Sequence, residues 1–120
     1  MAKITSFRDL LVWQKSMSLA ERSYLLSRRM RRDDQMALGH QIRKSSISIP
    51  SNIAEGFGRH HTAQYINQLW TSNGSNNELQ SQVELAHRVG VFNADETATL
   101  ITDAEEIGRM LGGLIKALER

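Results

Sequence analysis

The sequence predicts an all-α fold, an antiparallel up-down-up-down four-helix bundle, from three observations. Proline occurs once and aromatic residues make up 6% of the 120 residues, and both shortages are typical of helical proteins. Apolar residues recur at helical spacing along four segments. The connections between these segments are short, which favours neighbouring helices that run in opposite directions. Residues 1–120 are expected to form a single domain.

The first and fourth predicted helices have capping signals in the sequence. The first is expected over about residues 7–29, with Ser6 as N-cap and Asp9 at the third helical position. Its apolar stripe is predicted to consist of Leu10, Trp13, Met17, Ala20 and Tyr24, widened by Leu11 and Leu25. The fourth helix follows Asn93, which with Glu96 resembles a capping box. Its predicted stripe consists of Leu100, Ile101, Ala104, Ile107, Leu111, Leu114, Ile115 and Leu118.

The second segment contains the only proline, Pro50, within the run SISIPSNIAEGFGR (46–59). The predicted apolar face is Met36, Leu38, Ile42, Ser45, Ile49 and Ile53, and Asp33 or Asp34 is the expected cap. Because proline has no N–H, the carbonyl of Ser46 loses its helical partner, and serine hydroxyls or water are expected to replace it. A kinked helix that continues through Pro50 and stops at Gly56 and Gly58, with Arg59 near its last carbonyls, is therefore predicted.

The third segment is expected to begin near Thr62 as N-cap and to end at Gly90. Its apolar face is predicted to consist of Ile66, Leu69, Trp70, Leu79, Val83, Ala86 and Val89. The middle, residues 73–77 (NGSNN), is poor helix material. Two alternatives remain at this point, one long helix with a polar waist or two short helices.

The charge is unevenly distributed, although the net charge is only +2. Residues 1–60 contain 11 Lys or Arg and 5 Asp or Glu, whereas residues 61–120 contain 4 and 8. An arginine cluster lies at the end of the first helix and in the turn after it, namely Arg22, Arg28, Arg29, Arg31 and Arg32. Arginine suits phosphate, so these are the candidate nucleic-acid-binding residues, although Asp33 and Asp34 partly neutralise them and a helix C-terminus also favours cations. Alternatively, the basic and acidic faces meet when subunits assemble.

Other chemistry finds little support in the sequence. The absence of cysteine excludes disulfides and thiolate catalysis, and the start of the chain resembles neither a signal peptide nor a membrane span, so a cytoplasmic protein is expected. Glu84 and His87 have the spacing of one half of a di-metal bundle site, but the second half is missing. His60 and His61 are expected in a loop. No catalytic residue, metal or cofactor is predicted, and the chain is not expected to be an enzyme.

Three stretches resemble a known family. FRDLLVWQKS (7–16), LGHQIRKSSISIPSNIAEGFGR (38–59) and GSNNELQSQVELAHRVG (74–90) are similar to the four-helix-bundle proteins encoded in intervening sequences of bacterial 23S ribosomal RNA genes. Distant relatives include the accessory protein of diversity-generating retroelements, which binds nucleic acid and the reverse transcriptase. The resemblance implies a continuous second helix, a long third helix and a homopentameric ring, and it implies no enzymatic activity. The family's signature positions fall on Trp13, Gln14, Arg43, Ser48, Ser51, Asn52, Glu55, Gly56, Arg59, Ser75 and Glu78.

These signature positions predict a polar network where the second and third helices meet, with Arg43 paired to Glu78 or Glu55. Such a network fixes helix register or a subunit contact, or alternatively forms a ligand site. The function that follows is a non-enzymatic homo-oligomer, a homopentamer by resemblance, that binds RNA or single-stranded nucleic acid. The alternative is a scaffold that binds protein partners and has no nucleic-acid role.

Overall fold

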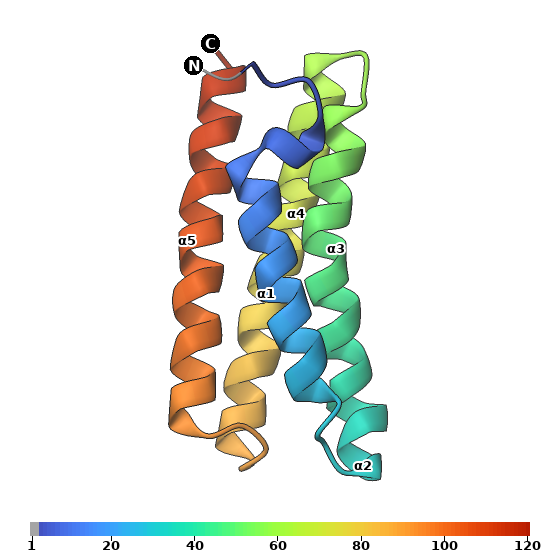
Figure 1. Cartoon of the computed structure of the whole chain (residues 1–120), viewed down its shortest axis with the longest axis vertical. Coiled ribbons are helices and arrows are strands. Elements are labelled where there is room, and N and C mark those ends of the chain that lie inside the picture. The colour runs from blue at the N-terminus through green and yellow to red at the C-terminus, as the bar shows by residue number, and fades with distance from the viewer. Residues whose placement is uncertain (1–2) are drawn as a thin grey trace.

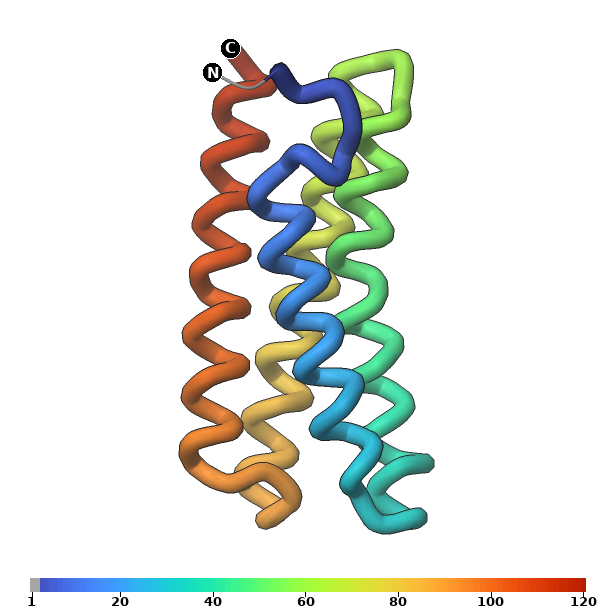
Figure 2. The backbone as a smooth tube through the Cα atoms, viewed as in Figure 1, coloured from blue at the N-terminus to red at the C-terminus, as the bar shows by residue number. Residues whose placement is uncertain are grey.

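The computed structural model describes residues 3–120 and confirms the predicted four-helix fold (Figure 1). The long helices are α1 (Leu11–Ser27), α3 (His40–Phe57), α4 (Thr62–Arg88) and α5 (Ala94–Leu118), and the short elements are η1 (Phe7–Asp9), α2 (Arg32–Asp34) and the π-helical turn η2 (Gln35–Gly39). Figure 1 shows that consecutive long helices run in opposite directions. Both α1 and α4 pack against α3 and α5. The bundle is elongated and measures 44 × 24 × 20 Å. The start of the described chain and the end of α5 lie at the same end of the bundle (Figure 2).

The first helix begins later than predicted. Ser6 and Asp9 form the expected capping box, but they cap the 3-10 turn η1. Leu10 then has an extended backbone, with φ −75° and ψ 123°, and α1 starts only at Leu11. The chain therefore turns once before it enters the bundle, and the predicted start at residue 7 is wrong.

The second helix continues through Pro50, as predicted, from His40 to Phe57. Neither Asp33 nor Asp34 caps it, because both lie inside the first helical turn, where carboxylates stabilise the helix N-terminus. Within residues 3–120 no serine hydroxyl donates to the carbonyl of Ser46, so of the two expected partners serine is the wrong one. Gly56 lies inside the helix rather than beyond it, and Gly58 is the C-cap.

The third helix, α4, is one continuous helix, which decides between the two alternatives. Its N-cap is His61 rather than Thr62. The polar residues of its middle bond to neighbouring helices: the Ser72 hydroxyl donates to the carbonyl of Ile49 at 2.9 Å, and the Asn76 amide donates to that of Ala104 at 2.8 Å. Weak helix formers are therefore held helical by tertiary contacts. Gly90, with φ +81°, ends the helix in a Schellman arrangement.

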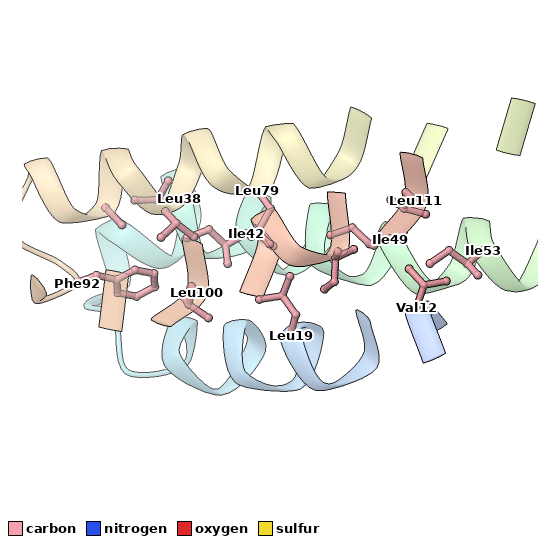
Figure 3. Packing of buried hydrophobic residues seen from close by; sticks show 14 of the residues in the cluster. Val12, Leu19, Leu38, Ile42, Ile49, Ile53, Leu79, Phe92, Leu100 and Leu111 are labelled. Atoms are coloured by element: carbon pink, nitrogen blue, oxygen red, sulfur yellow. The ribbon is translucent and has the colours of Figure 1, made fainter. Parts of the chain in front are cut away.

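The apolar core draws on all four long helices (Figure 3). The predicted faces of α3 and α5 are confirmed, except that Met36 is exposed. The predicted face of α1 is wrong in part. Ala20 is buried, and Leu10 and Trp13 pack against the core, as predicted. Met17, Tyr24 and Leu25 are exposed, however, and the helix also buries Val12, Ser16, Leu19, Ser23 and Ser27. Because serines occupy much of the buried face, the apolar pattern pointed to the neighbouring face. Trp70 and Val89 of the third predicted stripe are also exposed.

The first prediction is that two buried serines of α1 destabilise the bundle. The hydroxyls of Ser16 and Ser23 are fully buried and have no hydrogen-bond partner among the described residues. We expect Ser16→Ala and Ser23→Ala each to raise the free energy of unfolding by about 1 kcal/mol, because each removes an unpaired polar group and adds a better helix former. Urea denaturation of the variants measures this. Ser72→Ala is the matched control: its buried hydroxyl is hydrogen-bonded, so that variant is expected to lose stability, and equal effects at all three sites would contradict the argument.

Candidate functional site

A chain of hydrogen bonds connects α3 to α4. The hydroxyls of Ser75 and Ser48 are 2.7 Å apart, and the amide of Asn52 donates to the Ser48 hydroxyl at 2.9 Å. The amide of Gln68 in turn donates to Asn52 Oδ1 at 2.7 Å. Arg59 completes the chain by donating to Gln68 Oε1 at 2.9 Å and to Glu55 Oε1 at 2.7 Å. Every polar side chain in this series has a partner, which fixes the register of the two helices.

The structure brings part of the predicted set of polar residues together. Its members Ser48, Asn52, Glu55, Arg59 and Ser75 do come together, whereas Glu78 is exposed and lies outside it. Sequence reasoning missed Gln68, the link between Asn52 and Arg59. A glutamine nearly two turns into α4 has no distinguishing pattern, and only the packing of α4 against α3 brings it to Arg59. Arg59 bonds these side chains rather than the last carbonyls of α3.

Arg43 has a different role from the one predicted. Its guanidinium donates to the Ser27 hydroxyl at 2.9 Å and to Gln35 Oε1 at 2.8 Å, and it lies over the ring of Tyr24 at 5.8 Å from the centroid. The pairing with Glu78 or Glu55 is thus wrong. The Gln35 amide donates to the carbonyls of Ser27 and Met30 at the end of α1. Arg43 and Gln35 together hold the α1 C-terminus against the start of α3.

Ion pairs with α5 use part of the arginine cluster. Arg22 pairs with Asp103 and Arg29 with Glu96, and a third pair joins Lys15 to Glu106 at 2.5 Å. The Lys15 ammonium lowers the pKa of Glu106, and the pKa of Glu96 is lowered first by the backbone N–H of Asn93 and then by Arg29. Much of the charge asymmetry between the two halves of the sequence is therefore matched within one chain.

The remaining arginines of the cluster are exposed at one end of the bundle. Arg28 lies over the Tyr24 ring, 5.4 Å from its centroid. Arg31 and Arg32 form no ion pair within the described residues, and Asp33 and Asp34 follow them in the short helix α2. The structure adds two exposed basic side chains from the first turns of α3, His40 and Lys44, which the sequence did not single out. We call Arg28, Arg31, Arg32, His40 and Lys44 the basic end.

A shallow apolar depression of about 540 Å³ lies between α1 and α3. It is lined by Trp13, Met17, Ala20, Glu21, Tyr24, Leu25, Ile47, Pro50, Ser51 and Ala54, and we call it the α1–α3 groove. Met17, Leu25 and Ile47 are 44%, 49% and 48% exposed, which is unusual for large apolar side chains grouped together. The apolar residues that sequence analysis assigned to the core face of α1 thus line a surface.

The two remaining pairs of candidate residues, Glu84 with His87 and His60 with His61, are exposed. Glu84 and His87 are both exposed, and His87 Nδ1 lies 3.1 Å from the carbonyl of Phe92. Across residues 3–120 no three histidine, aspartate or glutamate side chains are grouped so that they could hold a metal ion. His60 and His61 are exposed in the connection between α3 and α4, as expected. Within the same residues, no helix has the length and apolar character needed to cross a bilayer.

Comparison with known proteins agrees with the motifs. The family model described as 23S rRNA-intervening sequence protein matches residues 8–113. The fold is similar to the crystal structure of a protein of unknown function from the S23 ribosomal protein family of Bacteroides thetaiotaomicron, with a TM-score of 0.83 and 27% sequence identity. The match covers 88% of this chain and 99% of that one. Among curated proteins, none matches the sequence.

Proposed function

Because the chain belongs to the 23S rRNA-intervening sequence protein family, we propose that it is a non-enzymatic, cytoplasmic homo-oligomer that binds RNA or other single-stranded nucleic acid. The proposal of nucleic-acid binding rests on one observation: only some arginines of the cluster form ion pairs within the chain. Arg22 and Arg29 form ion pairs with carboxylates of α5, whereas Arg31 and Arg32 are exposed at the basic end and form no ion pair among residues 3–120.

The chemistry of the basic end favours phosphate contacts. Guanidinium groups bind phosphate oxygens in a bidentate manner, and Arg28, His40 and Lys44 enlarge the cationic surface. Asp33 and Asp34 reduce the net charge, so a single copy is expected to bind weakly. In an oligomer the basic ends of several copies act together, and avidity then raises the affinity for a long strand.

Self-association is supported by the exposed apolar surface. Met17, Leu25 and Ile47 are about half exposed and line one groove, and grouped apolar side chains of this kind typically mark an interaction surface. The homopentamer is the state that the family resemblance implies, and mass measurement in solution by multi-angle light scattering tests it directly.

The second prediction concerns RNA binding. The double variant Arg31→Glu, Arg32→Glu is expected to weaken binding of a labelled single-stranded RNA by tenfold or more at low salt, because it replaces two phosphate contacts by repulsion. It should also reduce the slope of log K against log salt by roughly 1.4, since each phosphate contact on a single strand contributes about 0.7. Fluorescence anisotropy across a salt series measures both quantities.

The matched control makes the same change of charge elsewhere. Arg109→Glu with Lys116→Glu alters two exposed basic residues of α5, outside the basic end, and is expected to leave most of the affinity intact. Equal loss in both double variants would mean that only net charge matters, and wild-type protein that retains no RNA at low salt would refute the nucleic-acid role.

A scaffold that binds protein partners is the second candidate, and the α1–α3 groove favours it. Its lining is almost entirely apolar, which suits a protein surface better than a phosphate backbone. An intact oligomer that does not bind RNA would favour the scaffold function over nucleic-acid binding.

A further inference from the structure

A second exposed surface with apolar residues lies on α4. Trp70, Gly74, Ser81 and Leu85 share one helical face, and all four are exposed. Trp70 and Leu85 are 53% and 51% exposed, and Glu84 and Arg88 flank Leu85. We call these six residues the α4 ridge. Gly74 and Ser81, together with the polar Asn77 on the same face, separate the two large apolar side chains, which gives the ridge two apolar projections.

The ridge and the α1–α3 groove are similar in length, the ridge being about 4 Å longer. Trp70 and Leu85 are fifteen positions apart, about 22 Å along a helix. Along α1 the groove extends from Trp13 to Leu25, twelve positions or about 18 Å. A helix laid along the groove with its ridge inward would therefore bring both apolar projections into contact with apolar lining.

Hydrogen bonds between α3 and α4 fix the relative heights of the two surfaces along the bundle. The Ser48–Ser75 and Asn52–Gln68 contacts place Trp70 level with the Pro50–Ala54 segment of the groove. In a ring whose axis is parallel to the bundle, every copy stands at the same height. Trp70 of one copy would then face Pro50 and Ala54 of the next.

Charge agrees with this alignment at the other end of the ridge. The Ser45–Gln82 hydrogen bond places Lys44, which precedes the groove residue Ile47 by three positions, level with Glu84. Lys44 and Glu84 form no ion pair within the described residues of one chain. A second copy at equal height would bring these opposite charges together while Leu85 packs beside them.

We propose that the α4 ridge of one copy occupies the α1–α3 groove of the next, so that the chain assembles head to tail. This inference rests on the proposed self-association and names its two faces. Groove and ridge are different surfaces, so the contact is heterologous, and it closes into a ring when the rotation between copies permits. The occupant of the groove is therefore a second copy of this chain.

The test uses two variants, one in which the groove is disrupted and one in which the ridge is disrupted. Met17→Glu with Ile47→Glu places two charges in the groove, and Trp70→Glu with Leu85→Glu places two on the ridge. All four side chains are well exposed, so both variants are expected to fold, which circular dichroism checks. Each variant alone is expected to be monomeric. Mixed one to one, they are expected to form a heterodimer and nothing larger, since only one intact groove can meet one intact ridge.

The remaining outcomes distinguish the proposed contact between ridge and groove from self-association through any other surface. A monomeric wild-type protein overturns both. An assembled wild type whose ridge variant remains assembled overturns the inference alone, and points to groove-on-groove packing or to a different partner surface. Variants that stay monomeric when mixed also overturn it. Met36→Glu is the control, because this methionine is 76% exposed and belongs to neither face, and it is expected to leave the assembly unchanged.

Discussion

Replacing Gly56 by alanine is expected to lower the free energy of unfolding by about 2 kcal/mol, although alanine is the better helix former. A Cβ atom at this position would lie 2.8 Å from Gln68 Cβ, 3.0 Å from Tyr65 Cδ1 and 3.3 Å from the Tyr65 carbonyl oxygen. None of these atoms is the far end of a flexible side chain, so α3 and α4 must move apart. That movement also strains the hydrogen bonds of Gln68 with Asn52 and Arg59. Chemical denaturation of both proteins measures the loss.

The same substitution at Gly112 is the matched control. Gly112 lies within α5, is exposed, and has no atom within 4 Å of the position that a Cβ would take. There the gain in helix propensity acts alone, and Gly112→Ala is expected to raise stability by about 0.5–1 kcal/mol. We therefore expect the two substitutions to change the free energy of unfolding in opposite directions. A Gly56→Ala protein as stable as the wild type would show that α3 and α4 are not packed this closely.

Replacing Arg43 by methionine is expected to cost about 2 kcal/mol of unfolding free energy. Methionine keeps the apolar stem but removes the donors to Ser27 and Gln35 and the cation over the Tyr24 ring. Gln35 then loses the partner that orients it toward the last carbonyls of α1. We expect local loosening at this end of the bundle, which hydrogen exchange of the amides in the last turn of α1 and in η2 detects.

Arg109→Met controls for the loss of a positive charge from the surface. Arg109 is exposed on α5 and makes no ion pair among the described residues, so its replacement is expected to change stability by less than about 0.5 kcal/mol. Equal effects of the two replacements would contradict a bridging role for Arg43, as would unchanged hydrogen exchange in the Arg43→Met protein.

The sequence predicted the positions of the helices along the chain better than it predicted which face of each helix is buried. For α5, apolar residues at helical spacing and the Asn93–Glu96 capping box both pointed to the observed element. For α1, the same method selected a face that is only partly buried, because Ser16, Ser23 and Ser27 are buried while Met17 and Leu25 are exposed. Periodicity ranks residues by polarity. It has no means of recognising a helix that buries hydroxyls on one side and carries an apolar surface on the other.

The candidate site was predictable where contacts are local and unpredictable where they depend on helix crossing. Glu55 and Arg59 are one helical turn apart, and their ion pair follows from spacing alone. The partners of Arg22 and Arg29 lie more than sixty positions away, at Asp103 and Glu96, and no pattern within the arginine cluster identifies them. The groove likewise exists only once α1 and α3 are side by side.

The even number of long helices brings the beginning of the described chain back to the end of α5, at the end of the bundle opposite α2 (Figure 1). A short linker between these two points suits circular permutation, with new termini opened at the exposed His60–His61 connection. An affinity tag or fusion partner attached at this end of the bundle would likewise project away from Arg31 and Arg32. Immobilised protein would then present its basic end to the solution, which is the orientation that a surface-based binding assay requires.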